Sequence, residues 1–378
     1  AGFGAASLVA TYATSFGILE LSRVLQAVSG ALVSTSSAAL IRETAPADRR
    51  GEAFGLFDLL TSTSAAIGPF VGGVIVGALG WRAMFFVAVP IALVSAILVL
   101  VVVHPSREAD LADRGAHPRP LDAPGLVLLG LAIAAFLVAL HAIGDADATG
   151  QLVAAAAVVP LLLAFLAVEG RESHPAVDPR LFRRAAFAAA VAGVFGSTVV
   201  LHGSFILVPL LVERLLGNSA TTTGIVLLGL AGVGAVVSPF GGRLSDRRGR
   251  RLAVVAGSLL SAIGLAFLAL PASIASAAAV ALLLGVVGFG NGLTSPRQAA
   301  ALESVEPARV GMAAGTYYTG RYLGGVVGAS LAGALLGTTV TAGGVTLGFA
   351  VLAGTMVLVT VASLGLPGRR VAGVPAPA

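Results

Sequence analysis

Long apolar runs recur along almost the whole chain, and they constrain its fold more than any other feature. Each run is long enough to cross the ~30 Å hydrocarbon core of a bilayer as an α-helix, which rises about 1.5 Å per residue. The predicted spans are 17–41, 52–79, 83–103, 123–143, 151–168, 186–212, 222–240, 252–270, 273–294, 311–337 and 343–366. Charged residues make up only 11% of the chain, whereas a soluble domain carries roughly 25%. We therefore predict an all-α, multi-pass membrane protein.

The basic residues indicate which ends of these spans face the cytoplasm. All 23 of them are arginine. Nineteen lie in loops of one parity or in the C-terminal tail, namely Arg42, Arg49, Arg50, Arg107, Arg114, Arg119, Arg171, Arg180, Arg183, Arg184, Arg243, Arg247, Arg248, Arg250, Arg251, Arg297, Arg309, Arg369 and Arg370. Because basic loops are not readily translocated, this pattern predicts a protein of the cell membrane with a cytoplasmic C-terminus. The net charge of +5 is then a topology signal, and we expect no nucleic-acid partner.

The composition also excludes several kinds of chemistry. Without lysine the chain has no phosphate-binding G-x-x-x-x-G-K-[ST] loop, so it is not its own P-loop ATPase. Without cysteine it has no disulfide and no thiolate metal site, and its His, Asp and Glu residues show no metal-ligand spacing. The longest polar loop, 104–121, is too short for a soluble domain. We expect no enzyme activity, no cofactor and no metal site.

The most charged stretch is residues 242–251, which separate two of the predicted spans. Five arginines in so short a segment indicate a tight cytoplasmic turn. Gly242 and Gly249 would allow close helix approach and a turn with positive φ. Asp246 would accept bonds from neighbouring arginines or lie near a helix N-terminus.

The order of residues in this stretch, G-x-L-x-D-x-x-G-R-R, resembles the loop signature of the major facilitator superfamily of secondary transporters. The residues that carry the resemblance are Gly242, Asp246, Arg247, Gly249, Arg250 and Arg251. It implies a helical bundle of two pseudo-symmetric six-helix halves. A loop that only fixes topology is the alternative.

An internal repeat supports an organisation in halves. Segment 46–55 resembles segment 307–315, and Gly51 lies 260 residues before Gly311. With three spans per ~100 residues, equivalent points of a twelve-span protein would lie about 200 residues apart. The larger offset therefore leaves room for two extra spans, which 123–143 and 151–168 supply.

The repeat gives a domain assignment: 1–103 for the first half, 104–170 for a linker with two extra spans, and 171–378 for the second half and a short tail. The same offset places residues 1–10 at the end of a third span. We expect a parent protein of fourteen spans, whose first two spans and most of the third lie upstream of residue 1.

Two charged residues lie inside the first complete span. Glu20 and Arg23 are three residues apart and therefore share one face of the predicted helix. A charge inside a span needs a partner or water, so they form either an interfacial ion pair or a functional site. The pattern L-x-x-x-R-x-x-Q, which ends at Gln26, resembles the fourth-span signature of drug:proton antiporters. This resemblance implies a role for Arg23 in proton coupling.

A glycine-rich stretch marks the second complete span. Ser64, Gly68 and Gly72 recur every four residues, which predicts a ridge for close helix packing. Pro69 removes a backbone donor and would kink the helix. With Gly73, the stretch reads G-P-x-x-G-G and resembles the antiporter motif of the same superfamily. The resemblance implies export, whereas ordinary helix packing is the alternative.

Further polar residues lie within or near the spans. Arg321 is roughly 15 Å into its span at 1.5 Å per residue, and three tyrosines flank it. The pattern R-x-L-G-G-x-x-G that it begins resembles the thirteenth span of the fourteen-span branch, and a structural role is equally open. Asp58 is a candidate proton or cation site, or the partner of a loop arginine. Weaker candidates are Glu213, expected to pair with Arg214 at the outer edge, His202, expected to serve helix packing, and Asn291.

Taken together, these resemblances imply a drug:proton antiporter of the fourteen-span branch. Such a protein exports hydrophobic, often cationic, compounds by alternating access and uses the proton gradient. Its partners would be the small-molecule substrate, protons and the lipid bilayer, and we expect a monomer. Two alternatives remain open: a solute:proton symporter of the same fold, and a membrane sensor or scaffold that does not transport.

Overall fold

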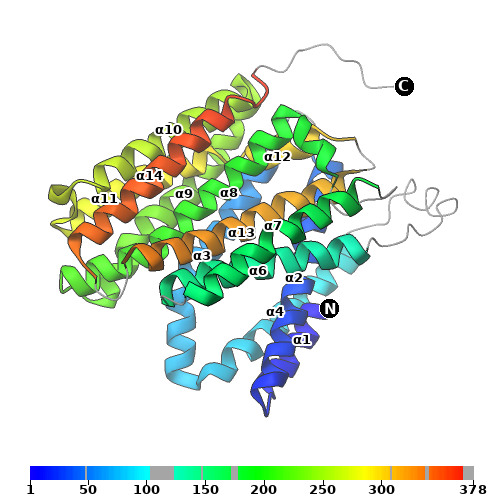
Figure 1. Cartoon of the computed structure of the whole chain (residues 1–378), viewed down its shortest axis with the longest axis horizontal. Coiled ribbons are helices and arrows are strands. Elements are labelled where there is room, and N and C mark those ends of the chain that lie inside the picture. The colour runs from blue at the N-terminus through cyan, green and yellow to red at the C-terminus, as the bar shows by residue number, and fades with distance from the viewer. Residues whose placement is uncertain are drawn as a thin grey trace, which may run out of the picture. The chain divides into compact units, whose positions relative to one another are not determined.

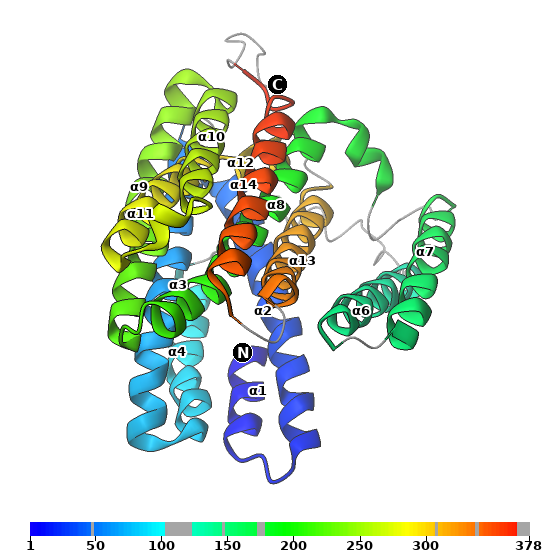
Figure 2. The same cartoon turned by 60° about the vertical axis from the view of Figure 1, so that its left-hand side comes forward.

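The computed structural model describes residues 1–46, 49–102, 123–145, 148–171, 178–306, 309–336 and 340–368. Within these ranges the chain forms helices and no strand, which confirms the all-α fold class (Figures 1 and 2). The α-helices are α1 (Gly2–Thr11), α2 (Phe16–Thr44), α3 (Arg50–Leu79), α4 (Trp81–Val102), α6 (Ala123–Asp145), α7 (Ala148–Glu169), α8 (Ala185–Pro209), α9 (Ala220–Arg248), α10 (Arg250–Leu268), α11 (Ala277–Leu293), α12 (Arg297–Glu303), α13 (Val310–Leu336) and α14 (Ala342–Ser363). Short 3₁₀ segments are η1 (Pro179–Arg183) and η3 (Pro271–Ile274), and η2 (Leu210–Leu215) is a π-helical turn.

Within the described residues, each predicted span corresponds to one long helix, in order α2, α3, α4, α6, α7, α8, α9, α10, α11, α13 and α14. Seven segments of the described residues are long and apolar enough to cross a membrane: Phe16–Arg42, Trp81–Val101, Ala185–Leu215, Thr221–Arg248, Arg250–Leu268, Ala277–Glu303 and Ala342–Ser363. Large apolar side chains on their outer faces, such as Leu100 and Leu358, are strongly exposed. This is the surface that a helix presents to lipid rather than to water.

The chain divides into two compact units. The first comprises Ala1–Ser37 and Ile67–Leu121, and the second comprises Ala38–Ala66 and Asp122–Ala378. In the first unit, α1 packs against α4, and Gly4 lies so close to Ala92 that a Cβ on the glycine would be 3.0 Å from that methyl group. Arg82, at the start of α4, donates to the carbonyl oxygen of Ala13 over 3.1 Å and lies over the Trp81 ring.

The second unit is built on close pairs of helices, α9 with α11 and α8 with α13, and on contacts of α10 with α11 and α14. Glycines permit the close approach. A Cβ on Gly288 of α11 would collide with the Leu230 carbonyl oxygen of α9, and one on Gly328 of α13 would collide with the Val199 carbonyl oxygen of α8. Small residues at such contacts are typical of membrane helices, because packing replaces the hydrophobic effect between them.

The two predicted linking spans form a helical hairpin. Both views show α6 and α7 lying side by side, and α6 also contacts α13 (Figures 1 and 2). Apolar side chains such as Val127 and Leu163 remain exposed on them. Their helical structure agrees with the predicted ranges, and their role as a linker between halves stays a prediction.

Candidate functional site

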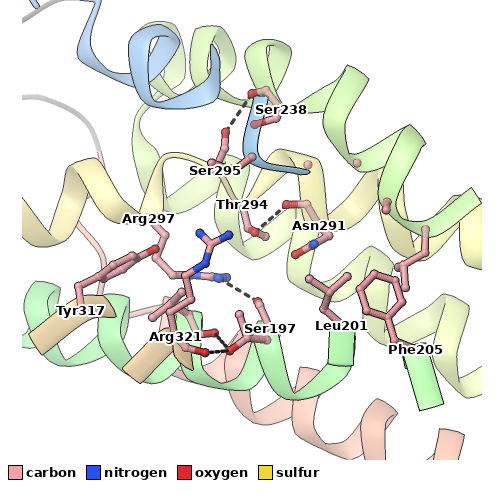
Figure 3. A pocket seen from close by; sticks show the side chains of 17 residues that line it. Ser197, Leu201, Phe205, Ser238, Asn291, Thr294, Ser295, Arg297, Tyr317 and Arg321 are labelled. Carbon is pink, nitrogen blue, oxygen red and sulfur yellow. Dashed lines mark hydrogen bonds between the residues drawn. The ribbon is translucent and has the colours of Figure 1, made fainter. Parts of the chain in front are cut away.

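A polar cavity lies inside the second unit, between α8, α9, α11, α12 and α13, with one residue from α3 (Figure 3). Its volume is about 100 Å³. The lining residues are Thr61, Val194, Ser197, Thr198, Leu201, Phe205, Leu230, Ala231, Gly234, Ser238, Asn291, Gly292, Thr294, Ser295, Arg297, Tyr317 and Arg321. Two arginines, an amide and several hydroxyls thus meet among helices that are otherwise apolar. Polar groups in a membrane interior are costly, so such a cluster is by default a candidate functional site.

Arg297 is held in the cavity by several hydrogen bonds. It begins α12, and only 2% of it is exposed. Its Nη1 donates to the Gly193 carbonyl oxygen over 3.0 Å and to Ser197 Oγ over 2.9 Å, and its Nη2 donates to Ser258 Oγ over 3.2 Å. A Cβ on Gly193 would collide with the Arg297 side chain, so a larger residue here would require that side chain to shift.

The position of Arg297 differs from the cytoplasmic loop that the sequence predicts for it. α11 ends at Leu293, but after a short turn the chain continues as α12, so that residues Ala277–Glu303 form one span-length segment. This turn directs Arg297 between α8 and α10 instead of into a loop. The sequence signal for this buried site is the pair of hydroxyls of Ser197 and Ser258, which lie in the middle of apolar runs. Polar residues at such positions often form hydrogen bonds between helices.

Arg321 lies on α13 within the span, as predicted, and it is half-buried at the same cavity. Its backbone carbonyl accepts a bond from Thr198 Oγ1 of α8 over 2.8 Å. The nearby rings of Tyr318 and Tyr322 are stacked at 6.3 Å. The structure therefore brings Arg321 and Arg297 to one cavity, which sequence spacing alone did not indicate.

The three weaker candidates, Asn291, His202 and Glu213, lie in different surroundings. Asn291 lines the cavity, and its carbonyl oxygen accepts a bond from Thr294 Oγ1 over 2.7 Å. His202 serves packing, because its Nδ1 is 3.1 Å from the Thr198 carbonyl oxygen and its ring contacts Phe205. Glu213 is exposed in the π-helical turn η2, where the described residues include no ion pair between it and Arg214.

The arginine-rich stretch forms more helix than expected. α9 continues through Gly242 to Arg248, and only Gly249, with φ of 93°, makes the turn into α10. The prediction of a positive φ holds for Gly249 and is wrong for Gly242, which is buried inside the helix. No residue between 242 and 248 is a strong helix breaker. The basic residues in the last turn also stabilise the helix, because they interact favourably with the negative C-terminal end of the helix dipole.

Asp246 lies near a helix N-terminus, one of its two expected arrangements. Its Oδ2 accepts a bond from the backbone nitrogen of Glu52, in the first turn of α3, over 3.1 Å. Glu52 Oε1 in turn accepts from Arg243 of α9, at 2.9 Å from Nη2 and 3.1 Å from Nε. We call Glu52, Arg243 and Asp246 the α3–α9 contact. Because exposed ion pairs contribute about 0–1 kcal/mol each, such a contact can open and close readily.

The other residues of the signature have separate positions. Arg247 is exposed, and the backbone nitrogen of Arg251 donates to the Pro367 carbonyl oxygen over 3.2 Å. Arg250 is buried and forms an ion pair with Glu303 of α12, which is also 4.0 Å from Arg50. The residues of the signature therefore connect α9 to the beginning of α3, and connect α10 to the end of α12 and to the segment after α14.

Under the transport function expected from the sequence, replacing Asp246 by asparagine should impair transport. Asparagine keeps an acceptor oxygen for the Glu52 nitrogen but removes the charge that interacts with the α3 N-terminus, an interaction of about 0.3–2 kcal/mol. Transport of a labelled substrate in cells with matched expression measures the effect. Glu213→Gln makes the same chemical change at an exposed site and should have no effect. Unimpaired transport in Asp246→Asn would mean that the loop only fixes topology.

In the first unit, Arg23 is held by Gln26 and not by Glu20. Its Nη1 donates to Gln26 Oε1 over 2.8 Å, and the guanidinium lies 5.7 Å from the centre of the Phe85 ring. Gln26 is itself buried and donates to Ser7 Oγ of α1 over 2.7 Å. No ion pair joins Glu20 to Arg23 within the part of the chain that the structure describes, and Glu20 is exposed. The expected pairing of these two residues is therefore not observed.

The glycine-rich motif lies on α3, but its predicted packing ridge is only partly observed. A Cβ on Gly72 would be in ordinary contact with Met84 at 3.4 Å. A Cβ on Gly68 would have no atom of the described residues within 4 Å. Pro69 and Gly73 lie within the same helix, and their side-chain surroundings are outside the described part. The same holds for the side chain of Asp58.

Apolar spanning helices around an internal polar cavity define a multi-pass membrane protein. The chain belongs to the Major Facilitator Superfamily, whose sequence pattern matches residues 1–329 and 185–377. This confirms the resemblance drawn from the motifs at the level of the superfamily.

Several curated relatives are similar over most of the chain. Multidrug resistance protein Stp of Mycobacterium tuberculosis is 29% identical over 345 residues, which cover 90% of this chain and 63% of Stp. The tetracenomycin C resistance and export protein of Streptomyces glaucescens is 28% identical over 346 residues, again 90% of this chain and 63% of that protein. The chain therefore spans a little under two thirds of the length of these relatives.

A solved structure has the same fold. The human organic anion transporter MFSD10 (TETRAN) gives a TM-score of 0.68 at 16% sequence identity, over 96% of this chain and 74% of that one. At this identity the likeness concerns the fold alone. It agrees with the major facilitator-type bundle predicted from the sequence.

Proposed function

We propose that the chain belongs to a secondary active transporter that exports drug-like small molecules by proton-driven alternating access, within the fourteen-span branch. The observation that carries the proposal is the polar cavity inside an apolar, membrane-spanning bundle. The names of the relatives Stp and the tetracenomycin C export protein support export of drugs as the direction and cargo. The protein would act in the cell membrane as a monomer, with a cytoplasmic C-terminus.

Alternating access requires contacts that close one end of the bundle and then release it. The α3–α9 contact fits this requirement, because it consists of one partly buried hydrogen bond and one largely exposed ion pair, and exposed ion pairs are individually weak. We infer that it stabilises one access state at the cytoplasmic ends of the helices. The pair of Arg250, which is buried, and Glu303, which is partly buried, would be broken less readily, because it is better shielded from water.

Proton coupling requires a group that releases and rebinds a proton. The arginines Arg23 and Arg321 cannot do this themselves, because an arginine stays charged in proteins, with a pKa above ~12. Glu20 and Asp58 are the candidate carboxylates. Asp58 lies three residues after Gly55, whose carbonyl oxygen accepts from Ser238 Oγ of α9, and three before Thr61, which lines the cavity. Asp58 is proposed on its position in the sequence of α3 alone.

Accumulation in cells tests the export activity. The full-length protein is expressed in a host that lacks its own drug exporters, and uptake is measured across dyes, biocides and antibiotics. Expressing cells should accumulate less of one or more compounds, and a protonophore should abolish the difference. Equal accumulation with and without the protein, across the panel and at confirmed membrane expression, would contradict the proposal.

A further inference from the structure

The segment that precedes α8 is held in place by buried contacts. It comprises residues 178–184, with η1 at its centre, and the span-length segment of α8 begins directly after it at Ala185. Leu181 is 2% exposed and belongs to the apolar core. Asp178 is also buried, and its Oδ2 accepts a bond from Arg309 Nη1 over 2.8 Å. η1 therefore has a defined position immediately outside a membrane-spanning helix.

Two arginines of η1 lie on one face of it. Arg180 and Arg183 are three residues apart, and both are exposed. In a 3₁₀ helix the side chains at positions i and i+3 eclipse each other. With a rise of about 2.0 Å per residue, the two side chains leave η1 on the same side, about 6 Å apart along its axis. Two guanidinium groups at this spacing can bind one phosphate group, since arginine contacts phosphate through bidentate hydrogen bonds.

The acidic groups that the structure describes near η1 bind other partners. Asp178 Oδ1 accepts a bond from the backbone nitrogen of Arg180 over 2.9 Å, and its Oδ2 is the acceptor for Arg309. Glu306 Oε1 is 3.5 Å from Nη2 of Arg184. Among the described residues, no ion pair involves the side chain of Arg180 or Arg183. The stretch 171–184 as a whole contains four arginines and two acidic residues, a net charge of +2.

An exposed phenylalanine adjoins the two arginines. Phe182 is 43% exposed, and its ring lies edge-on to the ring of Phe187 in α8, with 5.5 Å between the ring centres. Successive residues of a 3₁₀ helix are about 120° apart. Phe182 and the arginine pair therefore flank the side of η1 that is opposite the buried Leu181. This arrangement suits a ligand in which an anionic group is joined to an apolar chain.

We propose that Arg180 and Arg183 bind the headgroup of an anionic phospholipid, with the phosphate between the two guanidinium groups and an acyl chain against Phe182. The position of η1 at the end of a spanning helix brings it to the level of the lipid headgroups. The arginine-rich ends of the helices are predicted to face the cytoplasm, and the cytoplasmic leaflet carries anionic lipids. The two arginines thus have a role in addition to fixing topology. The inference is independent of the proposed export, because lipid binding requires neither substrate nor protons.

Native mass spectrometry of the purified full-length protein in detergent tests the inference. The protein is titrated with dioleoylphosphatidylglycerol and, separately, with dioleoylphosphatidylcholine, which has the same phosphate and chains but a compensating positive charge. The wild type should bind phosphatidylglycerol at least about tenfold more tightly, which corresponds to about 1.4 kcal/mol. Glycerol 3-phosphate at the same concentration should not displace phosphatidylglycerol, because it lacks the apolar chains.

The double replacement of Arg180→Gln and Arg183→Gln should lower the affinity for the first-bound phosphatidylglycerol at least about tenfold and leave phosphatidylcholine binding unchanged. Both side chains are exposed, so this variant should keep the elution volume and melting temperature of the wild type. The matched control replaces Arg247 and Arg248 by glutamine, which removes two exposed arginines at the arginine-rich end of α9. These adjacent residues point about 100° apart around an α-helix. They do not share one face, and the control should keep the affinity for phosphatidylglycerol.

Several results would overturn the inference. An equal loss of phosphatidylglycerol binding in both double variants would show that net charge alone attracts the lipid. Equal affinity of the wild type for the two lipids would show that the headgroup charge is not recognised. Displacement by glycerol 3-phosphate would show that the site binds free phosphate esters and not a lipid. Unchanged binding in the variant of Arg180 and Arg183 would show that the lipid binds elsewhere.

Discussion

Gly288→Ala should destabilise the bundle by about 3 kcal/mol or more, because overpacking at a tight contact forces backbone shifts. The new Cβ would collide with the Leu230 carbonyl oxygen and lie 2.6 Å from the Gly229 carbonyl oxygen. These are backbone atoms of α9, which cannot rotate away as a side chain could. α9 and α11 both line the cavity, so transport should be lost with stability. To measure the effect, the purified protein is heated in detergent, and the fraction that remains folded at each temperature is determined by size-exclusion chromatography.

Gly285→Ala is the matched control for this experiment. Gly285 lies three residues earlier in the same helix, and nothing lies within 4 Å of the position of its Cβ. Alanine there gains up to about 1 kcal/mol of helix propensity over glycine, so this variant should melt at the wild-type temperature or above it. Equal stability of the two variants would show that α9 and α11 are not as close as the structure places them.

Arg23→Lys should reduce proton-coupled transport at least about tenfold while expression stays normal, because lysine lacks the planar fork that binds a carboxylate bidentately. Gln26 accepts a bond from one nitrogen of Arg23 and is itself bonded to Ser7, which gives the guanidinium a preferred position on α2. A lysine keeps the charge but not this geometry. Substrate uptake driven by an imposed pH gradient in vesicles measures the loss.

Two further variants show whether the effect is specific. Arg82→Lys keeps a donor for the Ala13 carbonyl, which needs only one bond, and it should retain most activity. Glu20→Gln should cost less than Arg23→Lys, because the described residues show no ion pair between Glu20 and Arg23. Near-normal antiport in Arg23→Lys would mean that Arg23 only anchors its helix.

The sequence predicts the number and order of the long helices because each apolar run must satisfy its backbone hydrogen bonds within one helix. It predicts their ends less well. The span at 222–240 belongs to a helix, α9, that extends over Ala220–Arg248. Apolar character reports where a helix lies in the bilayer, whereas the helix itself continues into water until Gly249 adopts a positive φ.

The candidate site is only partly predictable for a different reason. Arg321 is recognisable as a charge within a span, but Arg297 follows Thr-Ser-Pro and has the sequence context of a loop. Its partners Ser197 and Ser258 are 100 and 39 residues away. Such contacts depend on the tertiary arrangement of α8, α10 and α12. Similarly, a spacing of three residues made Glu20 the expected partner of Arg23. Gln26, three residues after Arg23, is the residue that accepts its hydrogen bond.

Proton exchange in reconstituted vesicles tests the central claim most directly. The full-length protein is reconstituted with a pH-sensitive dye inside and the membrane potential clamped, and a compound identified by the accumulation assay is added outside. We predict that protons and compound move in opposite directions, that each movement requires the other, and that empty vesicles show neither. Movement of both in the same direction, or no proton movement while the compound crosses, would contradict proton-coupled export.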